Sequence, residues 1–151
     1  MAESFRVYKG ATLVVEGDSP LSITGVAPNT AVANGDYQAT RVVDGNESVK
    51  VDIPAFTTLP ITVTGVTLTP KTSSAESGTA GSRQLAAAVA PADATNKAVT
   101  YSIAPSTTGL SVSGTGLIEW DDTVVDGVYT TTVTTTDGSK TDTHVLTLTT
   151  P

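Results

Sequence analysis

The chain of 151 residues contains no cysteine, and aromatic residues make up only 5% of it. The absence of cysteine excludes a disulfide framework, a thiolate metal ligand and a thiol nucleophile. Folding must therefore rest on packing alone, with a core built mainly from valine, leucine, isoleucine and alanine. Apolar residues at 38% against charged residues at 15% indicate a folded chain rather than a disordered one.

Basic residues are also scarce, and the formal net charge is −7. Residues 1–60 hold four basic and seven acidic side chains (net −3), and residues 61–151 hold four and eight (net −4). Phosphate binding needs a clustered basic surface, so we expect no nucleic-acid partner. An evenly spread acidic charge mainly favours solubility.

Long apolar runs are missing as well. None is long enough to span a bilayer, so membrane insertion is not expected. The first twenty residues lack a basic segment followed by an apolar stretch, which is the pattern of a secretory signal. A chain that starts at Met1 is therefore expected to be made and used without export.

Residues 1–60 predict a small β domain. The segments 5–9 and 12–16 are separated by Gly10 and indicate two short strands. A further strand starts at Tyr37, and an Asp-Gly-Asn turn at 44–46 joins it to a strand that ends at Ile53. About 60 residues is close to the lower limit for one stable core, so we expect a partner to complete this unit.

This first segment resembles the back half of a fibronectin type III module. The family pattern has a Leu-Ile-Gly-Leu-Pro-like stretch before its strand and an Asp-Gly-Asn turn after it, as in residues 21–28 and 44–46. The chain departs from the family at 33–37, where Ala-Asn-Gly-Asp-Tyr replaces a continuous strand. It also lacks the front-half strands with their tryptophan, so the resemblance implies a truncated fibronectin-like unit.

Residues 61–151 predict a β-sandwich made of short strands and turns. The expected strands are 65–70, 83–90, 97–103, 109–112, 116–119, 127–136 and 142–149. Residues 73–82 (SSAESGTAGS) are predicted to be a loop, because they are polar and rich in glycine.

This second segment resembles a bacterial immunoglobulin-like domain of group 2. In that family a first strand ends in proline, a Val-Ser-Gly-Gly hairpin follows, and an Asp-Gly-Ser turn separates two Thr-rich strands. The matching positions are Val66, Leu68, Pro70, Leu85, Val89, Pro91, Asn96, Val99, Tyr101, Ser102, Val112, Gly114, Gly116, Gly127 and Val133. The resemblance implies an all-β fold and a structural or adhesive role rather than a catalytic one.

One acidic cluster is a candidate cation site, because calcium prefers several converging carboxylates. Its members are Glu119, Asp121, Asp122 and Asp126. The spacing does not match an EF-hand, and such runs are usually solvated. We therefore expect no metal and no cofactor, while binding of a cation by these four residues stays open.

The remaining candidates are His144, Trp120 and Tyr129. His144 is the sole histidine, but no nucleophile motif accompanies it and it lies inside a strand pattern, so we expect an exposed strand residue and no enzymatic activity. Trp120 and Tyr129 are candidates for a sugar-binding face, because aromatic rings stack on sugars. One tryptophan beside an acidic turn is little support for such a face, so we expect Trp120 to close one end of the sandwich.

Phe5, Val7 and Tyr8 are the candidate contact residues of the first unit. A terminal strand with this alternation is ordered when it joins a sheet, either that of its own domain or that of a partner. We weigh β-augmentation of a neighbouring chain against the alternative of an ordinary strand in its own domain.

Immunoglobulin-like domains of this group occur in bacterial surface adhesins and on structural proteins of tailed phages. Together with the missing export signal, the resemblance therefore implies a non-enzymatic structural protein of a tailed-phage virion, which we expect to decorate the capsid head after assembly in the host cytoplasm. The first unit is expected to bind the major capsid protein or another virion protein, or to self-associate, for example as a trimer. The second unit is expected to face outward and to contact cell-surface glycans weakly. The alternatives are a tail protein with an immunoglobulin-like appendage and a bacterial cell-surface adhesin module.

Overall fold

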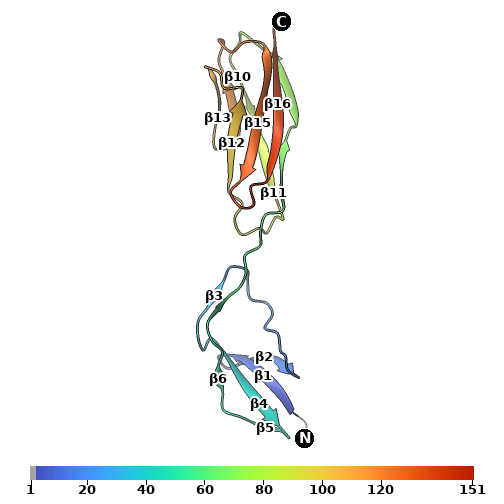
Figure 1. Ribbon diagram of the computed structural model, residues 1–151, viewed down its shortest axis with the longest axis vertical. Coiled ribbons are helices and arrows are strands. Elements are labelled where there is room, and N and C mark those ends of the chain that lie inside the picture. The colour runs from blue at the N-terminus through green and yellow to red at the C-terminus, as the bar shows by residue number, and fades with distance from the viewer. Residues whose placement is uncertain (1–2) are drawn as a thin grey trace. The chain divides into compact units, whose positions relative to one another are not determined.

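The computed structural model describes residues 3–151, in which every regular element is a β-strand (Figure 1). The predicted all-β class is therefore confirmed. The chain separates into two compact units, Met1–Pro60 and Ile61–Pro151. Among the described residues, no helix is long and apolar enough to cross a membrane.

The first unit is built on one antiparallel sheet with the strand order β2-β1-β4-β5, in which β6 also pairs with β4. Its strands are β1 (Glu3–Lys9), β2 (Thr12–Gly17), β4 (Tyr37–Val43), β5 (Asn46–Glu47) and β6 (Val51–Asp52). A separate small pair is formed by β3 (Ala31–Val32) and β7 (Phe56–Thr57).

The core of this unit is small and lies on one face of the sheet. Val7, Val32 and Tyr37 are its buried apolar members. The partly buried residues packed against them are Val15, Leu21, Ile23, Val26, Ile53 and Phe56. Outside this cluster, only Val42 and Thr40 are buried among the described residues of the unit, so its core is small for some sixty residues.

The second unit is an immunoglobulin-like sandwich. Its strands are β8 (Gly65–Thr69), β9 (Thr72–Glu76), β10 (Gly81–Gln84), β11 (Ala86–Ala90), β12 (Val99–Ala104), β13 (Leu110–Val112), β14 (Leu117–Trp120), β15 (Gly127–Thr135) and β16 (Thr141–Thr149). One sheet has the order β12-β15-β16-β9. In the other sheet, β8 pairs with β11, and β14 lies between β10 and β13. β10 and β11 follow one another as two parts of one interrupted strand. This is the arrangement of an immunoglobulin domain whose first strand is divided between the two sheets.

The sandwich core follows the period-2 alternation of its longest strands. On β15 and β16 every second side chain is buried, from Tyr129 to Thr135 on β15 and from His144 to Leu148 on β16. The buried cluster consists of Leu68, Leu85, Ile118, Trp120, Val124, Tyr129, Val133, Leu146 and Leu148. Each such aliphatic side chain contributes about 1.5–3 kcal/mol when it is fully buried, so this cluster dominates the stability of the unit.

The prediction of a loop over residues 73–82 is wrong at both ends. β9 occupies Thr72–Glu76 and pairs in parallel with β16, and β10 begins at Gly81. Serine and alanine have a low preference for strands, but pairing with the long β16 outweighs it. The tertiary fold supplies the backbone hydrogen bonds to β16 and partly buries Ser73 and Ala75. The true loop is the short segment 77–80.

Candidate functional site

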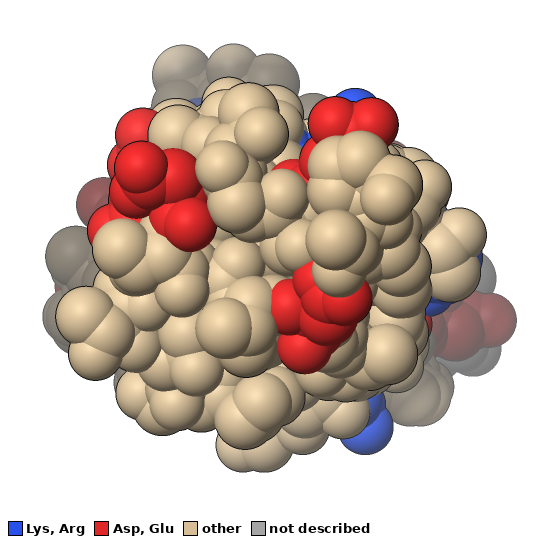
Figure 2. Space-filling model, turned by 90° about the horizontal axis from the view of Figure 1, so that it is seen from above, with Lys and Arg blue, Asp and Glu red and all other residues tan. Residues whose placement is uncertain are grey.

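The acidic residues predicted as a cluster do not converge on one point. Asp121 accepts hydrogen bonds from the backbone N–H and the hydroxyl of Thr123, at 2.9 and 2.6 Å. Asp126 accepts the hydroxyls of Ser77 and Thr150. Within residues 3–151 no three His, Cys, Asp or Glu side chains form a group that could hold a metal ion. Figure 2, viewed onto the end of the second unit that carries the C-terminus, shows separate acidic groups on a largely uncharged surface.

These hydrogen bonds give two of the acids a local structural role. Donation by Thr123 lowers the pKa of Asp121, and donation by Ser77 and Thr150 lowers the pKa of Asp126. Because Ser77 opens the 77–80 loop and Thr150 follows β16, Asp126 fastens both segments to the start of β15. Glu119 and Asp122 remain exposed at the surface.

His144 is fully buried, so the prediction of an exposed residue is wrong. It lies on β16 in the same alternation as Leu146 and Leu148, which places its side chain on the inner face. Its Nδ1 lies 2.7 Å from the carbonyl oxygen of Pro70, and its Nε2 lies 2.9 Å from the hydroxyl of Ser73. Because a carbonyl can only accept, Nδ1 carries a proton and donates it to Pro70.

A hydroxyl hydrogen-bonded to an imidazole is an arrangement that activates serine nucleophiles. Here the imidazole is buried, and the group that orients it is a backbone carbonyl rather than a carboxylate. The pair instead connects β16 to β9, and the bond to Pro70 reaches the segment between β8 and β9, where the first strand crosses from one sheet to the other. We assign Ser73 and His144 a structural role.

Tyr129 does not lie on a sugar-binding face. Its ring is 2% exposed, and its hydroxyl donates a 2.9 Å hydrogen bond to the carbonyl of Val125. A tyrosine near the start of this strand that bonds back to the preceding turn is the tyrosine corner of immunoglobulin-like sandwiches. The sequence prediction is therefore corrected for Tyr129, which stabilises the turn before β15.

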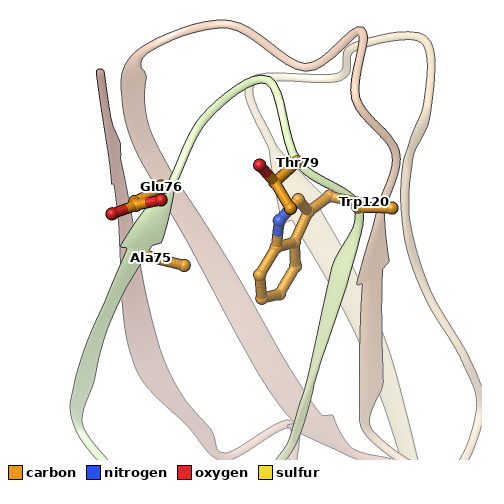
Figure 3. Close-up of a pocket in the computed structure, with 5 residues that line it drawn as sticks. Ala75, Glu76, Thr79 and Trp120 are labelled. Atoms are coloured by element: carbon orange, nitrogen blue, oxygen red, sulfur yellow. The ribbon is translucent and has the colours of Figure 1, made fainter. Parts of the chain in front are cut away.

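Trp120 lies at the end of β14 and borders a pocket of about 270 Å³ (Figure 3). The other lining residues are Ala75 and Glu76 from the end of β9, and Thr79 and Ala80 from the 77–80 loop. The figure shows the indole under the loop that joins the end of β9 to β10. We call this cavity the Trp120 pocket.

The polar groups of the Trp120 pocket lack partners. Trp120 is only 6% exposed, and its indole Nε1 is buried without a hydrogen-bond acceptor among the described residues. Among the described residues, the Glu76 carboxylate and the Thr79 hydroxyl also form no hydrogen bond. The indole packs directly against the backbone of Gly81, where a Cβ would lie only 2.5 Å from the indole Cζ2. The ring can take this position because glycine has no side chain.

The three candidate contact residues of the first unit, Phe5, Val7 and Tyr8, have different surroundings in the structure. β1 pairs with β2 on one side and with β4 on the other, so it has no free edge. β1 is therefore an ordinary strand of its own sheet and not a strand that adds to the sheet of a partner. Val7 is buried in the core. The hydroxyl of Tyr8 donates a 2.7 Å hydrogen bond to Glu47, which raises the pKa of Tyr8.

Phe5 is the member of this trio that faces an open surface. It lines a shallow apolar hollow of about 210 Å³ with Ala39, Thr40, Arg41, Ser48 and Val51. We call this surface the Phe5 hollow. Large apolar side chains are exposed mainly in the same unit, which contributes Leu13, Val14, Val49, Val51 and Leu59, whereas the sandwich contributes Val125 and Val128. No sequence signal distinguished Val51 from the core, because it sits in an ordinary alternating stretch.

An Ig-like virion protein of Serratia phage KSP90 is 38% identical to the chain over 118 residues, which is 78% of this chain and 43% of that protein. The chain thus spans less than half of the length of this relative. Because the sandwich has 91 residues, the similarity extends into the first unit.

Solved structures with a related arrangement have low identity. The fibronectin(III)-like modules of Clostridium thermocellum CbhA are 16% identical with a TM-score of 0.37, covering 97% of this chain and 78% of that one. Domains 1–6 of surface layer protein SbsC are 12% identical with a TM-score of 0.46, covering 99% of this chain and 20% of that one. No functional statement follows from similarities at this level.

A family model decides the assignment of the second unit. The model described as Putative Ig domain matches residues 60–151, which is more than half of the chain. The immunoglobulin-like assignment from the sequence is thereby confirmed, while the group 2 subtype stays a prediction. The chain belongs to the Putative Ig domain family.

Proposed function

We propose that the protein is a non-enzymatic structural component of a phage virion and that it decorates the capsid surface. The observation that carries this proposal is the 38% identity to the Ig-like virion protein of Serratia phage KSP90. The similarity reaches beyond the sandwich into the first unit, so it involves more than a widespread immunoglobulin-like module. A tail protein with an immunoglobulin-like appendage and a bacterial cell-surface adhesin module are the alternatives.

The first unit is the proposed attachment unit. Its core is small, and five of the seven exposed large apolar side chains of the described residues belong to it. A major capsid protein, another virion protein or further copies of the chain would cover this surface, as in a trimer. Binding of a partner stabilises a folded unit by mass action, which offsets the small core.

The second unit is the proposed outward-facing unit. Its nine-residue buried core makes it stable without a partner, and its surface is acidic and carries little exposed apolar area. A stable sandwich of this kind suits weak adhesion to glycans on the host-cell surface. Weak individual contacts become effective on a virion because many copies act together.

The placement is tested by labelling purified virions of the source phage with an antibody raised against residues 61–151, followed by electron microscopy. Label on the heads supports capsid decoration. Label confined to the tails replaces this proposal by the tail appendage. Virions without label favour the cell-surface module.

The attachment surface is tested in the same virions with variants of the full chain. Val51→Asp puts a charge at the edge of the Phe5 hollow, whereas Val125→Asp puts the same charge on an equally exposed position of the sandwich. We expect the first variant to be lost from virions and the second to be incorporated normally. Equal incorporation would exclude the Phe5 hollow as the attachment surface.

A further inference from the structure

The Trp120 pocket contains a buried donor with no partner. Indole Nε1 can only donate, and among the described residues it has no hydrogen-bond partner. Buried polar groups are nearly always paired in folded proteins, because an unmade hydrogen bond is costly away from water. An orphan of this kind beside a pocket indicates a place where a ligand atom or a water supplies the acceptor.

The other polar groups of the pocket define the chemistry of that ligand. Glu76 offers a carboxylate that only accepts, and Thr79 offers a hydroxyl that both donates and accepts. An inorganic anion would be repelled by Glu76. An ammonium group would pair with Glu76 but would leave the indole N–H without an acceptor. A sugar satisfies all three groups, because each of its hydroxyls can donate to a carboxylate while its oxygens accept from an N–H.

The apolar parts of the pocket suit the same ligand. The methyl groups of Ala75 and Ala80 and the edge of the indole supply a surface for the C–H groups of a sugar ring. A volume of about 270 Å³ has room for one ring rather than for a chain. A site for a terminal or branching residue of a glycan therefore fits better than an extended groove.

The pocket also lies at a suitable end of the sandwich. The chain enters this unit at Ile61, whose N–H binds the hydroxyl of Thr95. The entering segment also bonds through Val63 to Asp137, just before β16 begins, whereas Asp126 bonds to Ser77 of the 77–80 loop and to Thr150, just after β16 ends. The Trp120 pocket, which the 77–80 loop lines, therefore lies at the end of the sandwich opposite Ile61.

We propose that the Trp120 pocket is a saccharide site, in which Nε1 of Trp120 donates to a sugar oxygen and the Glu76 carboxylate accepts from a sugar hydroxyl. Nε1 itself has almost no accessible surface, so this contact requires that a side chain of the pocket lining moves aside when the sugar enters. This inference rests on the adhesive part of the proposed function and assigns that adhesion to named residues.

The chain offers a direct probe, because Trp120 is its sole tryptophan. The full-length protein is titrated with the methyl glycosides of glucose, galactose, N-acetylglucosamine and rhamnose while Trp120 emission is recorded. We expect at least one glycoside to produce a saturable shift, with an apparent Kd in the millimolar range that is typical of a single-ring contact, about 1 mM. Glu76→Ala and Thr79→Ala are each expected to weaken this binding about tenfold.

The matched control is Glu119→Ala, which removes an exposed carboxylate next to Trp120 on β14 but outside the pocket lining. It should leave the titration unchanged. The proposal is overturned if no glycoside gives a saturable shift, if Glu76→Ala binds as the parent does, or if methylammonium chloride binds and the glycosides do not. Labelling of virions reports separately on decoration, so failure of the pocket and failure of the capsid placement are distinguishable.

Discussion

Ser73 and His144 are 71 residues apart in the sequence and share a 2.9 Å hydrogen bond inside the sandwich. The same imidazole donates to the carbonyl of Pro70, so one buried side chain bonds both to β9, through Ser73, and to the segment that links β8 to β9. That segment carries the first strand from one sheet to the other. The two sheets are thus connected by a polar contact as well as by the apolar core.

We expect His144→Ala to lower the free energy of unfolding of the sandwich by about 3 kcal/mol, because it leaves a cavity and removes two buried hydrogen bonds. Ser73→Ala should cost about 1–2 kcal/mol, since it leaves Nε2 unpaired. Denaturant unfolding followed by Trp120 fluorescence reports on this unit alone. Thr143→Ala, at an exposed position of the same strand, is the control. Strictly additive effects in the Ser73/His144 double variant would show that the hydrogen bond contributes nothing.

The Asp142 carboxylate makes the free energy of unfolding depend on pH in a defined range. Lys71 pairs with its carboxylate, and the N–H groups of Leu68 and Thr143 also donate to it, which lowers its pKa from 3.8 to about 2. Because the folded-state pKa lies below the unfolded one, this contribution is complete above about pH 4 and is lost as the pH falls toward about 2.

The Asp142→Asn variant should therefore be less stable than the parent near neutral pH, and the difference should shrink between about pH 4 and about pH 2. The measurement is the denaturant midpoint of both proteins across this range. Taking the difference between the two proteins removes the contribution of the other carboxylates. A difference that stays constant with pH would mean that Asp142 does not titrate as described.

Much of the sandwich could be predicted because its strands carry a strict alternation. In β15 the side chains of Tyr129 and Val133 both point inward, as their two-residue spacing requires. β9 could not be predicted, because it pairs in parallel with β16, and its serine-rich sequence contains no local signal for that partner. The error on His144 has the same origin: histidine is polar, and its burial depends on a hydroxyl and a carbonyl that lie more than seventy residues away.

The candidate site was predictable only in part. The interpretation that Trp120 closes one end of the sandwich follows from its place after a short strand, and the structure buries it there. The contribution of Glu76 and Thr79 was not visible, because these residues were assigned to a loop. For Phe5, Val7 and Tyr8 the alternation was evident, but which side chain stays open depends on strands that come later in the sequence.

Thr131 offers a stabilising substitution. Its hydroxyl is buried on β15 with no hydrogen-bond partner among the described residues. Thr131→Val replaces this hydroxyl by a methyl group of similar size, so we expect a gain of about 1 kcal/mol in the free energy of unfolding. The measurement is the thermal midpoint, with Thr130→Val at the neighbouring, partly exposed position as the control. A loss of stability would indicate that a buried water satisfies the hydroxyl.

The contact between Gly81 and Trp120 gives the last prediction. A Cβ at position 81 would lie 2.5 Å from Cζ2 and 2.8 Å from Cε2 of the indole, so Gly81→Ala has to displace a large buried ring. We expect a loss of about 1–3 kcal/mol and a shift of Trp120 emission toward that of a more exposed indole. Gly65→Ala is the matched control, because it adds the same methyl group to a strand glycine with no atom within 4 Å and no positive φ. An unchanged emission spectrum and unfolding midpoint in Gly81→Ala would contradict the close contact, and with it the argument that this glycine holds the indole in place.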